Sequence, residues 1–139
     1  MQWNASPNAG FCPDGVEPWL PIGDDYTSMN VESELDDPGS LLSLTRELIR
    51  LRQSTPALRD GSYAPVDDVP EDCFVYWREG ADGRFLVALN FSAKETTIKL
   101  VNGGRSESRI STDIRRSGTV QLDSLVLGAN EGLVVEIQE

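Results

Sequence analysis

The sequence predicts a mainly β protein, in which a C-terminal antiparallel β-sandwich of Greek-key type follows an irregular loop and one α-helix. Three patterns predict this class. After Gly61, apolar and polar residues alternate with a period of two, in short runs separated by glycine-rich turns. One earlier stretch, residues 38–53, repeats at the helical period. The first 36 residues follow neither period and contain four of the eight prolines.

We interpret residues 1–36 as an irregular but ordered loop that packs against something. Disordered segments are poor in aromatic residues, whereas this one contains Trp3, Phe11, Trp19 and Tyr26. A structureless run of this length is uncommon in a compact domain, and it indicates either a functional loop or a domain that has been cut.

A helix is predicted over residues 38–53. Asp37 is the expected N-cap, Pro38 suits the first helical position, and Pro56 ends the helix by residue 55. A lone helix indicates the end of a larger domain, and hence a chain truncated at its N-terminus. We expect its apolar stripe to be covered by the sandwich or, as we favour, by a second copy in a homodimer. The stripe consists of Leu41, Leu44, Leu48 and Leu51.

A β-hairpin is predicted for residues 73–79 and 84–91, with a turn at 80–83 that contains Asp82-Gly83. The second strand is apolar on both faces, so we expect it at the centre of the sheet. Trp77 alternates with its neighbours and is expected in the core. Further strands are predicted over residues 96–101, 108–113, 119–122, 125–127 and 132–138, with a turn at 102–104.

The composition excludes several classes of function. The 12 basic and 23 acidic residues give a net charge of −11, which disfavours binding to nucleic acid or an anionic membrane. Without histidine, His-containing catalytic triads and His-ligated metal sites are excluded, and no metal or cofactor is expected. Cys12 and Cys73 lie far apart without a CxxC pattern, which indicates free thiols in a reducing compartment. No apolar run is long enough to span a bilayer, and we expect a cytoplasmic protein.

Short motifs follow one another along the whole chain. They include Met1-Gln2-Trp3-Asn4, Asn8-Ala9-Gly10-Phe11, Pro18-Trp19-Leu20-Pro21, Asp37-Pro38-Gly39-Ser40, Val87-Ala88-Leu89-Asn90-Phe91-Ser92 and Asn130-Glu131-Gly132. In this order they closely resemble the α-amylase superfamily (glycoside hydrolase family 13), in its oligo-1,6-glucosidase and α-glucosidase branch. One departure is Asn4, which stands where an aspartate is common in the family.

The resemblance implies that residues 1–60 are the final βα loop and last helix of a TIM barrel, and that residues 61–139 are the C-terminal β-sandwich domain. It implies an α-glucosidase-type enzyme whose substrate is a short α-1,4- or α-1,6-linked glucoside, hydrolysed by a retaining two-carboxylate mechanism. The family's catalytic carboxylates lie on barrel strands upstream of this segment. No catalytic residue is therefore assigned here, and the chain alone is expected to be inactive.

TIM-barrel active sites use the loops at the C-terminal face of the barrel. The resemblance therefore places the irregular loop beside the active site, where aromatic rings either stack on sugars or anchor the loop. The candidate substrate-loop residues are Trp3, Asn8, Phe11 and Trp19. The paired acids Asp24-Asp25, Asp36-Asp37 and Asp67-Asp68 lack the alternating spacing of a calcium loop, and we interpret them as solvated residues or helix caps.

Two other classes of protein stay open. The ectodomains of amino-acid transporter heavy chains share this architecture without hydrolysing sugars, and the upstream acids distinguish them from enzymes. An independent carbohydrate-binding sandwich would bind maltooligosaccharides as a stand-alone protein. Within the enzyme branch, maltase, isomaltase, dextran glucosidase, trehalose synthase and sucrose isomerase are alternatives.

Overall fold

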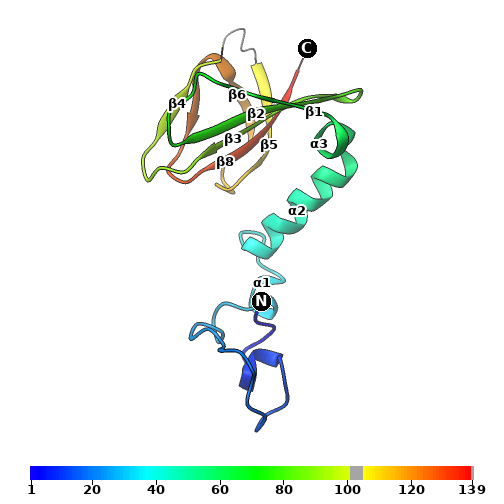
Figure 1. The fold of residues 1–139 in the computed structure, drawn as a ribbon, viewed down its shortest axis with the longest axis vertical. Coiled ribbons are helices and arrows are strands. Elements are labelled where there is room, and N and C mark those ends of the chain that lie inside the picture. The colour runs from blue at the N-terminus through cyan, green and yellow to red at the C-terminus, as the bar shows by residue number, and fades with distance from the viewer. Residues whose placement is uncertain (101–104, 139) are drawn as a thin grey trace. The chain divides into compact units, whose positions relative to one another are not determined.

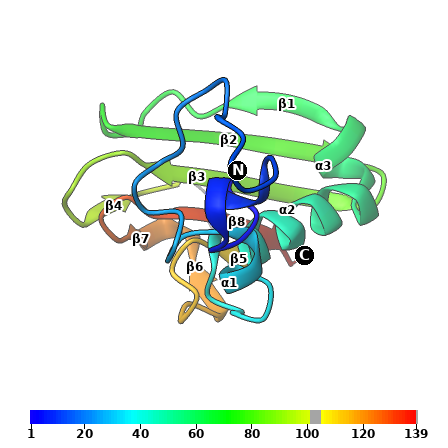
Figure 2. The same cartoon turned by 90° about the horizontal axis from the view of Figure 1, so that it is seen from below.

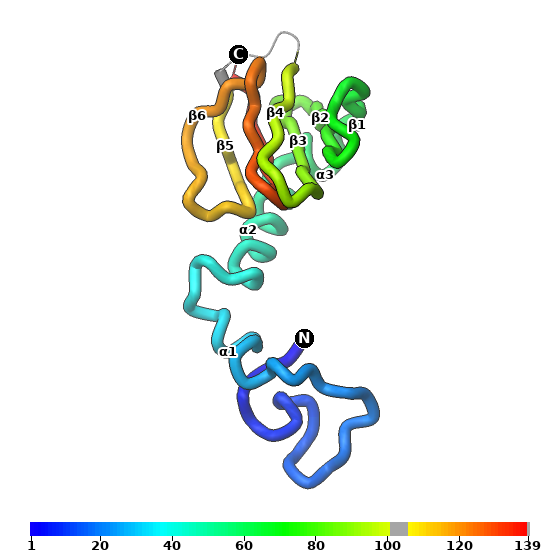
Figure 3. The backbone as a smooth tube through the Cα atoms, turned by 90° about the vertical axis from the view of Figure 1, so that its left-hand side faces the viewer, coloured from blue at the N-terminus to red at the C-terminus, as the bar shows by residue number. Residues whose placement is uncertain are grey.

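The computed structural model describes residues 1–100 and 105–138 and divides the chain into two compact units, residues 1–47 and 48–139. The sequence predicts a different boundary, after residue 60, between the end of a TIM barrel and a β-sandwich domain. That domain boundary stays a prediction. Up to residue 40 the first unit is mostly irregular, as expected (Figure 3). This part contains two short helical segments. These are η1 (Pro7–Gly10) and α1 (Val31–Glu34).

The two ends of the irregular loop are held together by backbone hydrogen bonds. The N–H of Val31 donates to the carbonyl of Gln2 over 2.9 Å, and the N–H of Glu32 donates to that of Trp3 over 3.0 Å. The side chain of the buried Asn30 caps α1 by accepting from the N–H of Ser33 over 2.9 Å. The loop is therefore closed on itself, which supports the interpretation that it is ordered rather than disordered.

Helix α2 (Leu41–Ser54) begins three residues later than predicted. Ser40 is the N-cap, because its Oγ accepts from the N–H of Ser43 over 3.1 Å. The carboxylate of Asp37 instead accepts from the N–H of Gly39 over 2.8 Å, within a turn. The predicted cap at Asp37 is thus wrong, since a turn that includes Gly39 intervenes. The predicted end is confirmed, and Pro56 starts a new helix, α3 (Pro56–Asp60).

The second unit contains a six-stranded antiparallel sheet in the order β1-β2-β3-β8-β5-β6 and a two-stranded sheet of β4 and β7, which together confirm the predicted antiparallel β architecture (Figure 1). Its strands are β1 (Ser62–Pro65), β2 (Cys73–Gly80), β3 (Gly83–Asn90), β4 (Thr96–Ile98), β5 (Arg105–Ser111), β6 (Gly118–Gln121), β7 (Leu125–Leu127) and β8 (Gly132–Ile137), with the short helix η2 (Leu122–Ser124) before β7.

The β2–β3 hairpin confirms the predicted hairpin, and β3 lies inside the sheet between β2 and β8 (Figure 2). Residues Phe85 to Ala88 are all buried, as expected for a central strand. The later strands form close to their predicted positions. β1 was not predicted, because the residues of Ser62–Pro65 do not alternate between polar and apolar. In the structure all four are exposed. The predicted turn at 102–104 lies outside the described residues.

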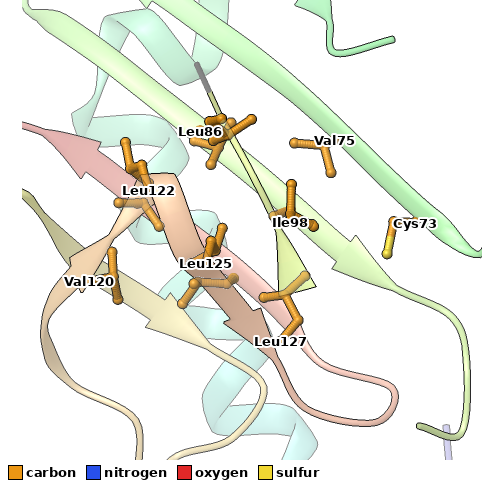
Figure 4. Packing of buried hydrophobic residues seen from close by; sticks show 12 residues of the cluster. Cys73, Val75, Leu86, Ile98, Val120, Leu122, Leu125 and Leu127 are labelled. Atoms are coloured by element: carbon orange, nitrogen blue, oxygen red, sulfur yellow. The ribbon is translucent and has the colours of Figure 1, made fainter. Parts of the chain in front are cut away.

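The core fills the space between the two sheets. Leu86 and Val75 of the large sheet face Ile98 and Leu127 of the small one, with Leu125 beside them (Figure 4). Trp77 is half-buried rather than fully in the core, and the Arg84 guanidinium lies 4.0 Å from the centre of its ring.

A buried polar network joins three loops of the sandwich. The Glu131 side chain is 6% exposed and accepts from the Ser111 hydroxyl over 2.6 Å, from Arg116 over 2.8 Å and from the N–H of Gly128 over 2.7 Å. The buried amide of Asn90 donates to the carbonyls of Lys94 and Gly128. Two motifs that are distant in the sequence, Asn90-Phe91-Ser92 and Asn130-Glu131-Gly132, therefore meet here.

The leucine stripe of α2 does not behave as one surface. Leu51 packs against the cluster formed by Ala57, Leu58 and Phe85, whereas Leu41 is 67% exposed and Leu48 is 40% exposed. Leu51 is thus partly covered within its own unit, by α3 and Phe85 of the sheet. The homodimer through the four leucines stays a prediction.

Candidate functional site

A left-handed turn shapes the start of the irregular loop. Asn8, Ala9 and Gly10 all have positive φ angles, of 60°, 51° and 74°. Such a conformation is strained for residues with a Cβ and needs surrounding contacts to hold it. The contacts are present, since Ala9 is fully buried and its carbonyl accepts from the N–H of Trp3 over 2.9 Å. At Gly10 an added Cβ would lie 3.1 Å from the Trp3 Cβ, a tight contact, and the φ of 74° would strain any residue with a side chain.

The side chain of Asn8 fastens the next part of the loop. Its amide nitrogen donates to the carbonyl of Pro13 over 2.8 Å and to that of Val16 over 2.9 Å. Both bonds need the NH₂ group, which an aspartate would lack. Asn8 therefore positions the backbone that follows, which includes the residues of the groove described next.

An apolar groove of about 470 Å³ lies within the loop and brings together two of the four candidate residues, Phe11 and Trp19. Trp19 is 91% exposed, which is unusual for a residue with so large an apolar side chain. Trp3 and Asn8 are not among the residues that line the groove. Those residues are Phe11, Cys12, Glu17, Pro18, Trp19, Leu20, Pro21 and Ile22.

Sequence reasoning missed most of this lining. The run Pro18-Trp19-Leu20-Pro21 held a usable signal, because a proline on each side of two large apolar residues keeps them extended and unable to join a helix. Glu17 is the only charged residue of the lining. The first 45 residues contain eight acids and no Lys or Arg, so the groove suits an uncharged ligand and disfavours an anion.

The acidic side chains and a second hollow on the sandwich are the other candidate sites. Across residues 1–100 and 105–138, no group of three or more Cys, Asp and Glu side chains lies close enough to hold a metal ion. In the same residues, no helix is both long and apolar enough to cross a membrane. A second, open hollow on the sandwich contains Arg115 and Arg116, and these form ion pairs with Asp113 and Glu131. Hydrogen bonds from Arg115 lower the pKa of Asp113.

Comparison with known proteins places both units in one family. The model of the α-amylase catalytic domain matches residues 1–61. Probable oligo-1,6-glucosidase 2 of Bacillus subtilis (strain 168) is 39% identical over 101 residues, which are 71% of this chain and 17% of the relative. The crystal structure of trehalulose synthase MutB from Pseudomonas mesoacidophila MX-45 matches with a TM-score of 0.86 at 32% identity, over 99% of this chain and 24% of that one. The chain belongs to the α-amylase family.

A further relative carries the name of a transporter heavy chain. Amino acid transporter heavy chain SLC3A1 of Mus musculus is 35% identical over 144 residues, which are 98% of this chain and 21% of the relative. The chain thus spans only 17–24% of the length of the relatives named here. The comparisons confirm the family and the fold class inferred from the sequence, including the match of the β domain to the C-terminal β domain of family 13 enzymes.

Proposed function

We propose that the chain is the C-terminal part of an α-glucosidase-type glycoside hydrolase that acts on short α-1,4- or α-1,6-linked glucosides. The observation that carries this proposal is the 39% identity to an oligo-1,6-glucosidase over 71% of the chain. In this proposal residues 1–60 supply a loop and the last helix of the catalytic barrel, and residues 61–139 form the sandwich. A retaining pair of carboxylates about 5 Å apart lies upstream.

In the proposed enzyme the groove of Phe11 and Trp19 contributes to substrate binding. Sugar rings present apolar C–H groups that pack on exposed aromatic faces, and the Trp19 ring is free for such contact. The absence of basic residues from the first 45 favours a neutral glucoside over a phosphorylated one. Trp3 and Asn8 act through the loop, as positioning residues that hold the turn and the backbone after it.

The test compares two proteins. The 139-residue chain alone should release no glucose from maltose or isomaltose, whereas the full-length enzyme should release it from both and should hydrolyse trehalose 6-phosphate far more slowly. In that enzyme Trp19→Ala should raise KM with a smaller change in kcat, and Tyr26→Ala serves as a control in the same loop outside the groove. Glucose release by the chain alone, or equal use of the phosphorylated sugar, would contradict the proposal.

The second candidate is a transporter heavy chain, favoured by the 35% identity that extends over 98% of the chain. The upstream sequence separates the two candidates. A heavy chain would lack the carboxylate pair and would show no hydrolysis of either disaccharide at full length. A cytoplasmic location also stays part of the proposal for the enzyme, and fractionation of cells that express the full-length protein would test it.

A further inference from the structure

A single carboxylate stands at the apolar groove of the loop. Glu17 is the charged residue of the groove lining, and it is exposed. Across residues 1–100 and 105–138 its carboxylate takes part in no ion pair. The binding mode proposed for the groove uses the aromatic rings and leaves this carboxylate without a task.

The backbone on both sides of Glu17 is fixed. The N–H of Val16 donates to the carbonyl of Pro13 over 3.2 Å, and the carbonyl of Val16 accepts from the amide of Asn8 over 2.9 Å. On the other side, Pro18 restricts the residue before it to extended conformations. The Cα of Glu17 therefore keeps a defined place at the groove, and only the side-chain torsions are free.

The surroundings of Glu17 strengthen its effect on a ligand. The rest of the lining is apolar apart from Cys12, and apolar walls lower the local dielectric constant, so a charge acts there more strongly than on an open polar surface. The first 45 residues contain no Lys or Arg that could neutralise the carboxylate, and their other acids add to its field. The electrostatic potential in the groove is therefore negative.

An aromatic ring beside a carboxylate is complementary to the two sides of a glucose ring. The apolar C–H face packs on an indole such as that of Trp19, which is 91% exposed. A carboxylate only accepts hydrogen bonds, and its two oxygens can accept from two neighbouring hydroxyls at the edge of the sugar. A phosphate group in place of a hydroxyl has little to donate at neutral pH and carries a charge of about −1.5 to −2. The same carboxylate therefore attracts a neutral sugar and repels an anionic one.

We propose that Glu17 determines the charge selectivity of the groove. Its carboxylate accepts hydrogen bonds from the hydroxyls of a neutral glucosyl unit and repels a unit that carries an anionic group. This inference rests on the proposed function, because it requires that the groove contacts the glucoside. It assigns to one side chain the preference for neutral substrates, and so makes Glu17 a specificity-determining residue.

The test uses three forms of maltose that differ only at C6 of the reducing-end glucose, which carries a hydroxyl, a phosphate or an ammonium group. This glucose is the leaving group, so the substituent stays off the ring at which the bond breaks. The values of kcat and KM are measured for the full-length enzyme and for Glu17→Gln, which keeps the size of the side chain and removes its charge. Glu32→Gln is the matched control, because Glu32 is an exposed glutamate of the same acidic segment outside the groove.

Glu17→Gln should raise kcat/KM about tenfold for the phosphate form and lower it about threefold for the ammonium form, since phosphate carries roughly twice the charge. The value for maltose itself should change less than about threefold, mainly through KM. A steric effect would move both charged forms in the same direction. In the unchanged enzyme, salt raised from about 0.01 M to about 1 M should shrink the differences between the three forms, because the screening length falls from about 30 Å to about 3 Å. Glu32→Gln should leave all three values as they are.

The outcomes separate this inference from the proposed function. If the enzyme hydrolyses maltose but Glu17→Gln moves neither charged form, or moves both in the same direction, the role of Glu17 is overturned and the proposed function is intact. An equal effect of Glu32→Gln would also overturn it, because the field of the whole segment would then be the cause. If the full-length protein hydrolyses none of the three sugars, the proposed activity is refuted, and calorimetric binding then tests the groove. Opposite shifts in Kd for the two charged forms in Glu17→Gln would support the selectivity, whereas equal shifts or no binding would refute it.

Discussion

Removal of the Glu131 carboxylate should be among the most damaging single changes in the sandwich. Three groups donate hydrogen bonds to this buried side chain: the Ser111 hydroxyl, the Arg116 guanidinium and the N–H of Gly128. In Glu131→Ala the Ser111 hydroxyl and the Gly128 N–H lose this acceptor. The largely buried Arg116 still donates to the Val126 carbonyl, but it loses the carboxylate that balances its charge. Breaking one side of a buried ion pair costs about 3–5 kcal/mol, whereas the total stability of a domain is about 5–15 kcal/mol.

The milder variant Glu131→Gln retains one acceptor oxygen, and we expect it to cost about 1.5–3 kcal/mol, the contribution of a hydrogen bond to a charged group. Urea unfolding of the chain, followed by the far-UV circular dichroism of the strands, measures both values, and an unchanged m-value shows that the folded and unfolded states stay comparable. Arg115→Ala is the control, because the Arg115 side chain is 86% exposed and should have no measurable effect. If Glu131→Ala unfolds at the same urea concentration as Arg115→Ala, the Glu131 carboxylate does not hold the β5–β6 and β7–β8 loops together.

Four further outcomes follow from particular contacts. A chain of residues 62–139 should fold, but it should be about 1.5–3 kcal/mol less stable in urea than residues 48–139, because Phe85 loses its cover; equal stability would show that α3 contributes nothing. Gly80→Ala should lower stability by about 1–3 kcal/mol through its clash with Ala57, and an unchanged melting temperature would mean that α3 moves away freely. Burial, and secondarily the Asp72 charge, raise the pKa of Cys73, so the folded state binds this proton more tightly than the unfolded state. The stability that the protonated Cys73 thiol contributes is therefore present below the ordinary pKa of a thiol and is lost as the pH rises through the raised pKa. Cys73 should also react with a thiol reagent more slowly than Cys12, and equal rates at the two cysteines would contradict the burial of Cys73. If a homodimer forms through α2, Leu44→Lys combined with Leu48→Lys should dissociate it in light scattering, whereas a monomer before the change would rule that dimer out.

Local patterns were sufficient for the parts of the fold that depend on neighbours in the chain. The alternation in residues 84–91 predicted a central strand, because a strand with two apolar faces must be covered on both. The turn at 80–83 predicted the hairpin, and Pro56 predicted the end of α2, since proline lacks the N–H that would continue the helix. The ordered motifs along the chain predicted the family, and the comparisons confirm it.

Tertiary structure decided everything that joins residues distant in the sequence. β1 forms because Ser62–Pro65 pair with β2, although their own pattern shows no alternation. Leu51 differs from Leu41 only through what lies beside it. The Glu131 network needs Ser111 from the end of β5 and Arg116 from the loop after it. Likewise, the sequence analysis named aromatic residues of the loop as candidates for substrate contact. Only the folded loop places Phe11 and Trp19 on one groove and uses Asn8 to hold its backbone. The physical reason is that periodicity and turn residues report local backbone preference, whereas long-range pairing depends on the summed packing and hydrogen bonding of the whole chain.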